Sequence, residues 1–194
     1  MVNFEDTART PLIIRAPFKP KAAGTTTAAL VMLVDMYPTI AALTGSGTPS
    51  VPVDGHDHSA LFDHPDDVNG STSAPYAFTQ YPRCPTGGDP SVPAGWAKNY
   101  CKSTHNPDIQ YMGLSVRDAR WRATLWLPWN GTALTPRWDA RPTAVELWDY
   151  DGSDGSDFDS FPVGHTNLAT RPEHAATLQR LLAACGQHFG APVK

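Results

Sequence analysis

Five aspartates crowd one stretch of this 194-residue chain, and such a cluster suggests a calcium-binding loop. They are Asp149, Asp151, Asp154, Asp157 and Asp159. An EF-hand loop that began at Asp149 would need glycine at its sixth position and glutamate at its twelfth, where this chain has Asp154 and Ser160. We therefore interpret the stretch as a solvated acidic loop.

Histidines and aspartates form a second cluster, centred on the segment His56-Asp57-His58. Its neighbours in the sequence are Asp54, Asp63 and His64. Imidazole and carboxylate groups both ligate metal ions, but this spacing matches no established motif. The sequence therefore predicts a polar surface turn here, and it predicts no metal and no other cofactor in this chain.

The sequence shows no recognisable catalytic nucleophile with a neighbouring base to activate it. The chain has seven histidines, but it has no Gly-x-Ser-x-Gly segment that would hold a serine nucleophile in a strained turn. Cys84 precedes a proline, and an isolated loop thiol is more often inert than catalytic. We therefore assign no catalytic residue. Trp96 lies in a loop with no local strand to pack on, so its ring is a candidate for ligand recognition.

The cysteines and the glycosylation sequons bear on the compartment in which the chain matures. Cys84, Cys101 and Cys185 include no Cys-x2-Cys pair, so no zinc signature is present. Cys84 and Cys101 could form a disulfide in an oxidising compartment, and the spacing alone leaves this open. The sequons Asn69-Gly70-Ser71 and Asn130-Gly131-Thr132 fit a secretory setting, although such triplets often arise by chance.

Charge and composition exclude several classes of protein. A net charge of −4, from 15 basic and 19 acidic residues, argues against a nucleic-acid partner. The longest apolar run, residues 28–34, is far shorter than the roughly 20 residues of a membrane span, so we predict no membrane partner. With 15 glycines and 19 prolines, the chain is neither collagen, nor a coiled coil, nor a long helical bundle.

Short apolar or alternating runs predict the strands. Residues 76–81 and 144–149 read as strands, and residues 112–116 with 121–126 read as a hairpin. The apolar run Leu12-Ile13-Ile14, between two prolines, predicts a further, buried strand.

Two segments predict helices. Asp35 can cap a helix that ends at Gly45, with a buried stripe formed by Tyr37, Ile40, Ala41 and Leu43. A second helix begins near Arg171, and its apolar face comprises Ala175, Leu178, Leu181, Leu182 and Cys185.

These elements predict an α+β fold, with an antiparallel sheet of about four strands and a C-terminal helix. Residues 45–75 and 82–110 read as long irregular stretches, the first with one helical turn near residues 59–62. Loops longer than about 15 residues are uncommon in a compact domain unless they are functional. We therefore expect the chain to be part of something larger.

Five segments, taken in order, carry a family resemblance. They are residues 3–13 (Asn-Phe-Glu-Asp-Thr-Ala-Arg-Thr-Pro-Leu-Ile), 34–45 (Val-Asp-Met-Tyr-Pro-Thr-Ile-Ala-Ala-Leu-Thr-Gly), 79–83 (Thr-Gln-Tyr-Pro-Arg), 112–117 (Met-Gly-Leu-Ser-Val-Arg) with Trp121-Arg122, and 146–149 (Glu-Leu-Trp-Asp) followed by Asn167-Leu168-Ala169. Their order and spacing resemble the C-terminal portion of the sulfatase family, and within it the iduronate-2-sulfatase-like branch.

The resemblance implies an alkaline-phosphatase-like α/β fold for the whole protein and hydrolysis of sulfate esters, in this branch often on glycosaminoglycans. In the family a formylglycine, made from the cysteine of a Cys-x-Pro-Ser-Arg segment, and a calcium ion lie in the N-terminal part. Cys84-Pro85-Thr86 is not that segment. We therefore expect residues 1–45 to complete an N-terminal domain and residues 46–194 to form the C-terminal subdomain.

The same resemblance implies roles for two residues. In this branch the loop after the Gln-Tyr-Pro-Arg segment leans toward the mouth of the active site, which makes Arg83 and Trp96 substrate-binding candidates. The expected partner is a sulfated small molecule or glycan, bound by the full-length protein in a secretory, lysosomal or extracellular setting. The isolated chain should be inactive. The alternative is a non-enzymatic sulfatase-like module that binds a partner or a sulfated glycan.

Overall fold

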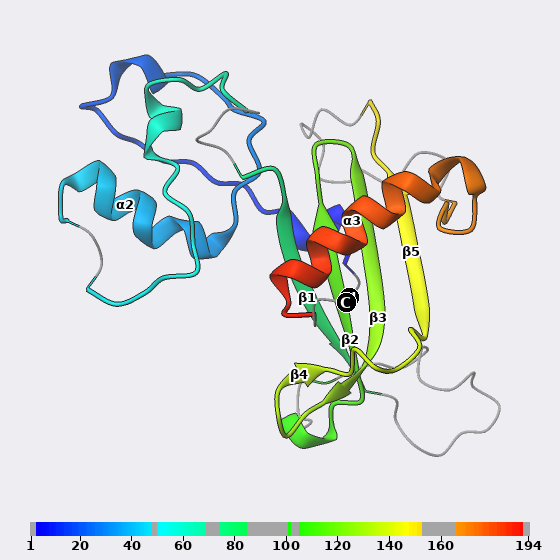
Figure 1. The fold of residues 1–194 in the computed structure, drawn as a ribbon. Coiled ribbons are helices and arrows are strands. Elements are labelled where there is room, and N and C mark those ends of the chain that lie inside the picture. The colour runs from blue at the N-terminus through cyan, green and yellow to red at the C-terminus, as the bar shows by residue number, and fades with distance from the viewer. Residues whose placement is uncertain are drawn as a thin grey trace. The chain divides into compact units, whose positions relative to one another are not determined.

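The computed structural model describes residues 3–47, 50–68, 74–84, 101, 105–152 and 166–191 (Figure 1). The chain divides into two compact units. The first unit comprises residues 1–9 and 78–194, and the second comprises residues 10–77. The second unit is therefore inserted in the sequence of the first, and each is described by itself.

A five-stranded sheet forms the first unit. Its strands are β1 (Ala77–Arg83), β2 (Tyr111–Arg117), β3 (Trp121–Asn130), β4 (Thr135–Pro136) and β5 (Ala144–Asp149). β2 lies between β1 and β3, and β3 also pairs with β5 and, at its end, with β4. The pairs that β3 makes with β2, β4 and β5 are all antiparallel. The predicted strands at 76–81 and 144–149 and the predicted hairpin are thus confirmed.

Asp118 fixes the turn of the β2–β3 hairpin. Its Oδ1 accepts hydrogen bonds from the backbone N–H groups of Arg120, at 2.8 Å, and Trp121, at 2.5 Å. An aspartate that accepts from the backbone two residues on is typical of tight turns. The turn sets the register in which Leu114 faces Leu125 and Arg117 faces Arg122.

The two faces of the β2–β3 pair differ in chemistry, because side chains alternate along a strand and directly paired residues share a face. One face is apolar and carries Leu114, Val116, Ala123 and Leu147, all fully buried. The other face carries Ser115, Arg117, Arg122, Thr124 and Trp126, also buried. A buried face of this polarity needs internal partners for its hydrogen-bonding groups.

Helix α3 (Ala175–His188) packs on β2 and β3 and crosses the sheet in Figure 1. A 3-10 turn, η7 (Pro172–His174), leads into it, in agreement with the helix start predicted near residue 171. Leu181 and Cys185 are fully buried, while Ala175 at the first turn is exposed. The predicted apolar face of this helix is therefore correct at its centre and wrong at its N-terminal end. Two short elements complete the unit: α1 (Glu5–Ala8) and η5 (Asn106–Asp108).

The second unit contains η1 (Pro20–Ala22), η2 (Leu33–Asp35), α2 (Met36–Thr44) and η3 (Ser59–Phe62). The predicted end of α2 is confirmed, since Gly45 adopts φ 67° and ψ 22°, the left-handed conformation that suits glycine. The predicted helical turn near residues 59–62 is also present as η3.

The apolar stripe predicted for α2 is wrong at two of its four residues, whereas the other two, Ala41 and Leu43, are half-buried. Tyr37 is 60% exposed and Ile40 46% exposed, whereas Pro38 and Thr39 are buried. The reason is a polar contact: the Thr39 hydroxyl accepts a hydrogen bond from the backbone N–H of His58 at 3.0 Å. This contact turns the Thr39 side of the helix toward the interior of the unit.

The buried strand predicted at Leu12-Ile13-Ile14 is absent. This segment has no regular secondary structure, and Ile13 is 91% exposed. A strand needs a neighbouring strand to pair with, and the described part of the chain provides none for it.

The chain is of the α+β class, with a curled antiparallel sheet and a C-terminal helix, as the sequence predicted. Among the described residues no helix combines the length and hydropathy of a membrane span. The predicted division at residue 45 refers to a longer protein and stays a prediction.

Candidate functional site

Arg83, predicted to face a substrate, is the last residue of β1. Its guanidinium lies over the indole ring of Trp126, with 5.1 Å from the guanidinium carbon to the ring centroid. Such a cation–π contact uses the flat face of the guanidinium, whereas hydrogen bonds to an anion use its edge. The contact with Trp126 therefore positions the Arg83 side chain at the end of β1.

Trp126 is a rigid support for Arg83. Only 1% of Trp126 is exposed, and its Nε1 donates a hydrogen bond to Glu146 Oε1 at 2.8 Å. Trp148 Nε1 donates to the other oxygen of the same carboxylate at 3.0 Å. A Cβ added at Gly113 would lie 2.6 Å from the Trp126 ring, so only glycine leaves room for the indole on that side.

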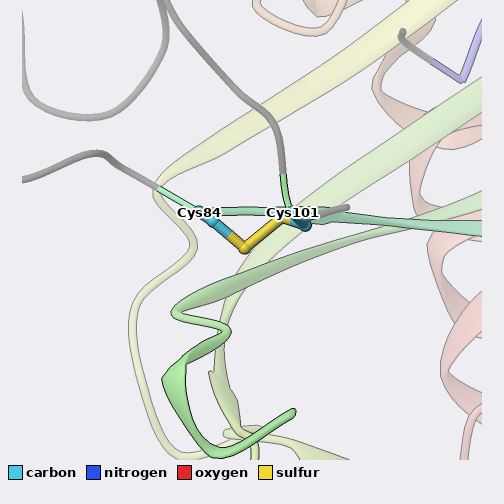
Figure 2. Close-up of a disulfide and its surroundings, with 2 residues drawn as sticks. All are labelled: Cys84 and Cys101. Atoms are coloured by element: carbon cyan, nitrogen blue, oxygen red, sulfur yellow. A yellow bond between two sulfur atoms is a disulfide. The ribbon is translucent and has the colours of Figure 1, made fainter. Parts of the chain in front are cut away.

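A disulfide follows Arg83 directly. Cys84 is bonded to Cys101, with 5.4 Å between their Cα atoms, at the end of β1 (Figure 2). The pairing that the sequence left open is thus present in the structure. Trp96, the other predicted substrate-binding residue, lies outside the described residues. Its segment, residues 85–100, is joined at both ends to the disulfide next to Arg83. We refer to Arg83, Trp126 and the Cys84–Cys101 disulfide as the Arg83 site.

A buried ionic cluster lies on the polar face of the β2–β3 pair. Glu5 Oε1 accepts hydrogen bonds from Arg117 Nε at 2.8 Å and from Arg122 NH2 at 2.7 Å. All three residues are less than 9% exposed. Burial alone would raise the pKa of Glu5, but the guanidinium groups of Arg122 and Arg117 outweigh it and hold this pKa below its usual value.

Neighbouring polar groups complete this cluster. Asn3 Nδ2 donates to the backbone oxygen of Gly113 at 3.2 Å, and Arg122 NH1 donates to the Ser115 hydroxyl at 3.2 Å. The guanidinium of Arg117 lies over the Tyr150 ring, at 4.9 Å. Burial raises the pKa of Tyr150 to about 12, so the phenol stays neutral at physiological pH. The cluster fastens residues 3–8 to the sheet, and its burial indicates a structural role.

The second unit has a polar core of its own around Asp35. Its carboxylate accepts hydrogen bonds from the backbone N–H groups of Met32, at 2.7 Å, and His56, at 2.8 Å, and it contacts His58 Nε2 at 3.2 Å. Asp35 therefore precedes α2, as predicted, but its side chain does not cap that helix. Burial alone would raise the pKa of Asp35, and the hydrogen bonds from His58, His56 and Met32 reverse this and lower it.

The prediction of a polar surface turn at His56-Asp57-His58 is wrong for one of its residues. His58 is 2% exposed and paired with Asp35. Two of the aspartates around it have separate partners: Asp63 pairs with Lys19 at 2.6 Å, and Asp57 Oδ1 accepts from the backbone of Ser59. In the described residues, no group of three or more His, Cys, Asp or Glu side chains is placed to hold a metal ion.

The acidic stretch after β5 is described only at its start. Asp149 and Asp151 both pair with Arg120, at 2.7 and 3.2 Å. The side-chain hydrogen bond from Arg120 lowers the pKa of Asp149. Asp154, Asp157 and Asp159 lie outside the described residues.

Sequence reasoning missed both buried clusters. Glu5 and Arg122 are 117 positions apart, and a single sequence carries no signal that pairs two such residues. Asp35 and His58 were each singled out, but for a helix cap and a surface turn. Glu5, Arg117 and Arg122 all lie in the segments that carry the family resemblance, but nothing in those segments pairs them.

Comparison with known proteins yields a weak structural match. No family model matches the chain, and no curated protein matches it. Among solved structures, the chain is similar to a "putative sulfatase" from Bacteroides thetaiotaomicron VPI-5482, with 18% sequence identity and a TM-score of 0.45. The match covers 79% of this chain and 23% of that one. A likeness this weak carries no argument about function.

Proposed function

We propose that this chain is the C-terminal module of a sulfatase-type hydrolase of sulfate esters. In this proposal the chain supplies scaffold and one wall of the substrate pocket, and polypeptide upstream supplies the nucleophile and the metal site. One observation carries the proposal: the segments that resemble sulfatases bond to one another in space, although they are far apart in the sequence.

The first such contact joins two of these segments. Asn3 and Glu5 belong to the first segment, and Gly113, Arg117 and Arg122 belong to the fourth. Glu5 bonds to both arginines and Asn3 to the Gly113 carbonyl. This contact supports the proposal, because segments that a family shares are expected to meet in its fold.

The second contact joins the two parts of the last segment. Asn167 Oδ1 accepts from the backbone N–H of Leu147 at 3.0 Å, and its Nδ2 donates to the Val145 carbonyl at 3.0 Å. Leu168 N–H donates to the Leu147 carbonyl at 2.9 Å. Asn167 thus satisfies backbone groups along β5 that no strand in the described part of the chain pairs, and this explains an asparagine at that position.

The surface of the second unit supports a larger protein. Of the described residues, all but one of the exposed large apolar side chains belong to this unit. They are Leu12, Ile13, Phe18, Leu33, Val34, Tyr37, Ile40, Val51 and Val53. Large exposed apolar patches mark surfaces that another polypeptide covers, and we propose that the upstream polypeptide covers these side chains.

The Arg83 site is our proposed contact with substrate. A guanidinium donates paired hydrogen bonds to sulfate-like anions with good geometry. Trp126 holds the Arg83 side chain from one face, and the disulfide fixes the start of the segment that carries Trp96. In this proposal Arg83 binds the sulfated substrate and Trp96 packs against its ring.

The test begins with the native protein. Antibody capture from its source, followed by mass spectrometry, should return a product much larger than 21.0 kDa, with an upstream formylglycine in a Cys-x-Pro-Ser-Arg context and turnover of an aryl sulfate. A native product of 21.0 kDa would overturn the proposal. Retention of that small product on immobilised heparin without turnover would instead support a non-enzymatic, glycan-binding module.

The role of Arg83 is tested in the full-length protein. Arg83→Ala should raise KM by about tenfold, because it removes one charge-assisted contact with the substrate, and a tenfold change corresponds to about 1.4 kcal/mol. Arg83→Lys keeps the positive charge and should recover part of the lost affinity. Arg137→Ala is the matched control, since Arg137 is an exposed arginine of the same unit. An unchanged KM in Arg83→Ala would remove Arg83 from the substrate site and leave the family proposal standing.

A further inference from the structure

The turn that joins β3 to β4 carries the sequon Asn130-Gly131-Thr132 on the surface of the first unit. Asn130 is the last residue of β3 and pairs with Thr135 of β4, and both Asn130 and Thr132 are exposed. A sequon is accepted for N-glycosylation only where its asparagine is accessible. This one meets that condition.

The orientation of the Asn130 carboxamide is set by the turn. Its Oδ1 accepts hydrogen bonds from the backbone N–H groups of Thr132, at 3.2 Å, and Ala133, at 3.0 Å. The amide nitrogen, Nδ2, makes no hydrogen bond within the part of the chain that the structure describes. The nitrogen that would carry a sugar is therefore the atom that the turn leaves unused.

Gly131 explains how the two sequon side chains come to face outward. It is buried, and a Cβ built on it would lie 1.9 Å from the backbone oxygen of Asn106 in η5. Only glycine fits this close approach of two backbones. Gly131 is therefore buried against η5, while Asn130 and Thr132 on either side remain exposed.

The cysteines give an independent indication of the compartment. Cys84 and Cys101 are bonded, and disulfides persist in the secretory pathway and outside the cell rather than in the reducing cytosol. The third cysteine does not disturb this pairing, because Cys185 is fully buried and burial raises its pKa to about 12. A chain that matures where this disulfide forms also meets the enzymes that attach N-glycans.

We propose that Asn130 is N-glycosylated during passage through a secretory compartment. The co-reactant is an oligosaccharide linked through pyrophosphate to a membrane lipid. A bond forms between Asn130 Nδ2 and the anomeric carbon of the first sugar, the bond from that carbon to the pyrophosphate oxygen breaks, lipid pyrophosphate leaves, and Nδ2 loses one proton. This inference does not depend on the proposed sulfatase function.

The glycan would cover an exposed apolar residue. Leu134 lies in the same turn, is 55% exposed and adopts φ 55°. Among the described residues of the first unit, Leu134 is the only large apolar residue that is exposed. A glycan on Asn130 shields this position from contact with other chains.

The test expresses the 194-residue chain behind a cleavable secretion signal in eukaryotic cells and recovers it from cells and medium together. Because the second sequon, at Asn69, lies outside the described residues, all variants carry Asn69→Gln. Asn69→Gln alone should lose mass on treatment with peptide N-glycosidase, and the Asn130 peptide should then contain aspartate. Asn69→Gln with Thr132→Ser, which keeps the sequon, should behave in the same way.

Asn69→Gln with Thr132→Ala removes the sequon without touching Asn130, and it should show no mass loss. The proposal is overturned if Asn69→Gln alone gives one unshifted species, whether it is recovered from cells or from medium. It is equally overturned if the Thr132→Ala variant still shifts, since the glycan would then be elsewhere.

Discussion

Glu5 and Arg122, 117 positions apart in the chain, are joined by a 2.7 Å contact between Oε1 and NH2. Arg117 approaches the same oxygen from the neighbouring strand at 2.8 Å. One carboxylate therefore neutralises part of the charge of two buried guanidinium groups. The N-terminal segment is held to the sheet through this oxygen, and the stability of the first unit depends on it.

Removing the Glu5 charge should destabilise the first unit strongly. Glu5→Gln leaves two buried arginines without a counter-ion, and breaking a buried pair in this way costs about 3 to 5 kcal/mol. Urea unfolding followed by tryptophan fluorescence measures the loss, because the tryptophans of β3 and β5 lie in this unit. Asp151→Asn, at the exposed end of the Arg120 pair, is the control and should change the unfolding free energy far less.

Acid should destabilise the first unit through the same residue. The pKa of Glu5 is lowered in the folded state from a reference value of 4.5, so its contribution to stability is fully present above about pH 4.5 and is lost as pH falls through the folded pKa. Unfolding midpoints measured between about pH 6 and pH 3 should fall steeply in the wild type. Glu5→Gln should show a flatter profile, and equal slopes would contradict this role.

Asp35 should hold the second unit together. The Asp35 carboxylate accepts three hydrogen bonds, whereas the carboxamide in Asp35→Asn has one accepting oxygen and one donating NH2 group. We expect the unfolding free energy of this unit alone to fall by about 1.5 to 3 kcal/mol. Hydrogen exchange read by mass spectrometry should show faster exchange in residues 32–62 and unchanged exchange in β2 and β3. His64→Gln, at an exposed histidine of the same unit, serves as the control.

The disulfide and the free cysteine should respond differently to reagents. Replacing Cys84 and Cys101 together by serine should lower the unfolding free energy by about 2 to 4 kcal/mol, because the closed loop no longer restricts the unfolded chain. In the native protein Cys185 should resist alkylation, since it is fully buried and its pKa is raised to about 12. Rapid alkylation of Cys185 before unfolding in urea would show that α3 is not packed as described.

Much of the first unit was predictable, and the reasons are local. The alternation within residues 112–116 and 121–126 and the turn-forming Asp118 are properties of short segments, so the hairpin follows from them. Gly45 ends α2 for an equally local reason. The buried face of α2 was not predictable from periodicity, because Tyr37 and Thr39 lie on different sides and only the contact with His58 selects one.

Long-range pairing was the part that the sequence did not reveal. A strand at Leu12-Ile13-Ile14 was predicted from composition, but composition does not show whether a partner strand exists. The Glu5 cluster needs the register of β2 against β3 before Arg117 and Arg122 can be placed side by side. Of the predicted substrate contacts, Arg83 is placed beside Trp126, whereas Trp96 lies outside the described residues.

The insertion of residues 10–77 between the two parts of the first unit has a consequence for synthesis on the ribosome. Glu5 leaves the ribosome long before Arg117 and Arg122 exist, and until then its carboxylate is in water. The inserted unit has all its residues available earlier, and domains generally fold as units while the chain is being made. The second unit should therefore fold first, and the N-terminal segment should dock last, once the β2–β3 hairpin has emerged.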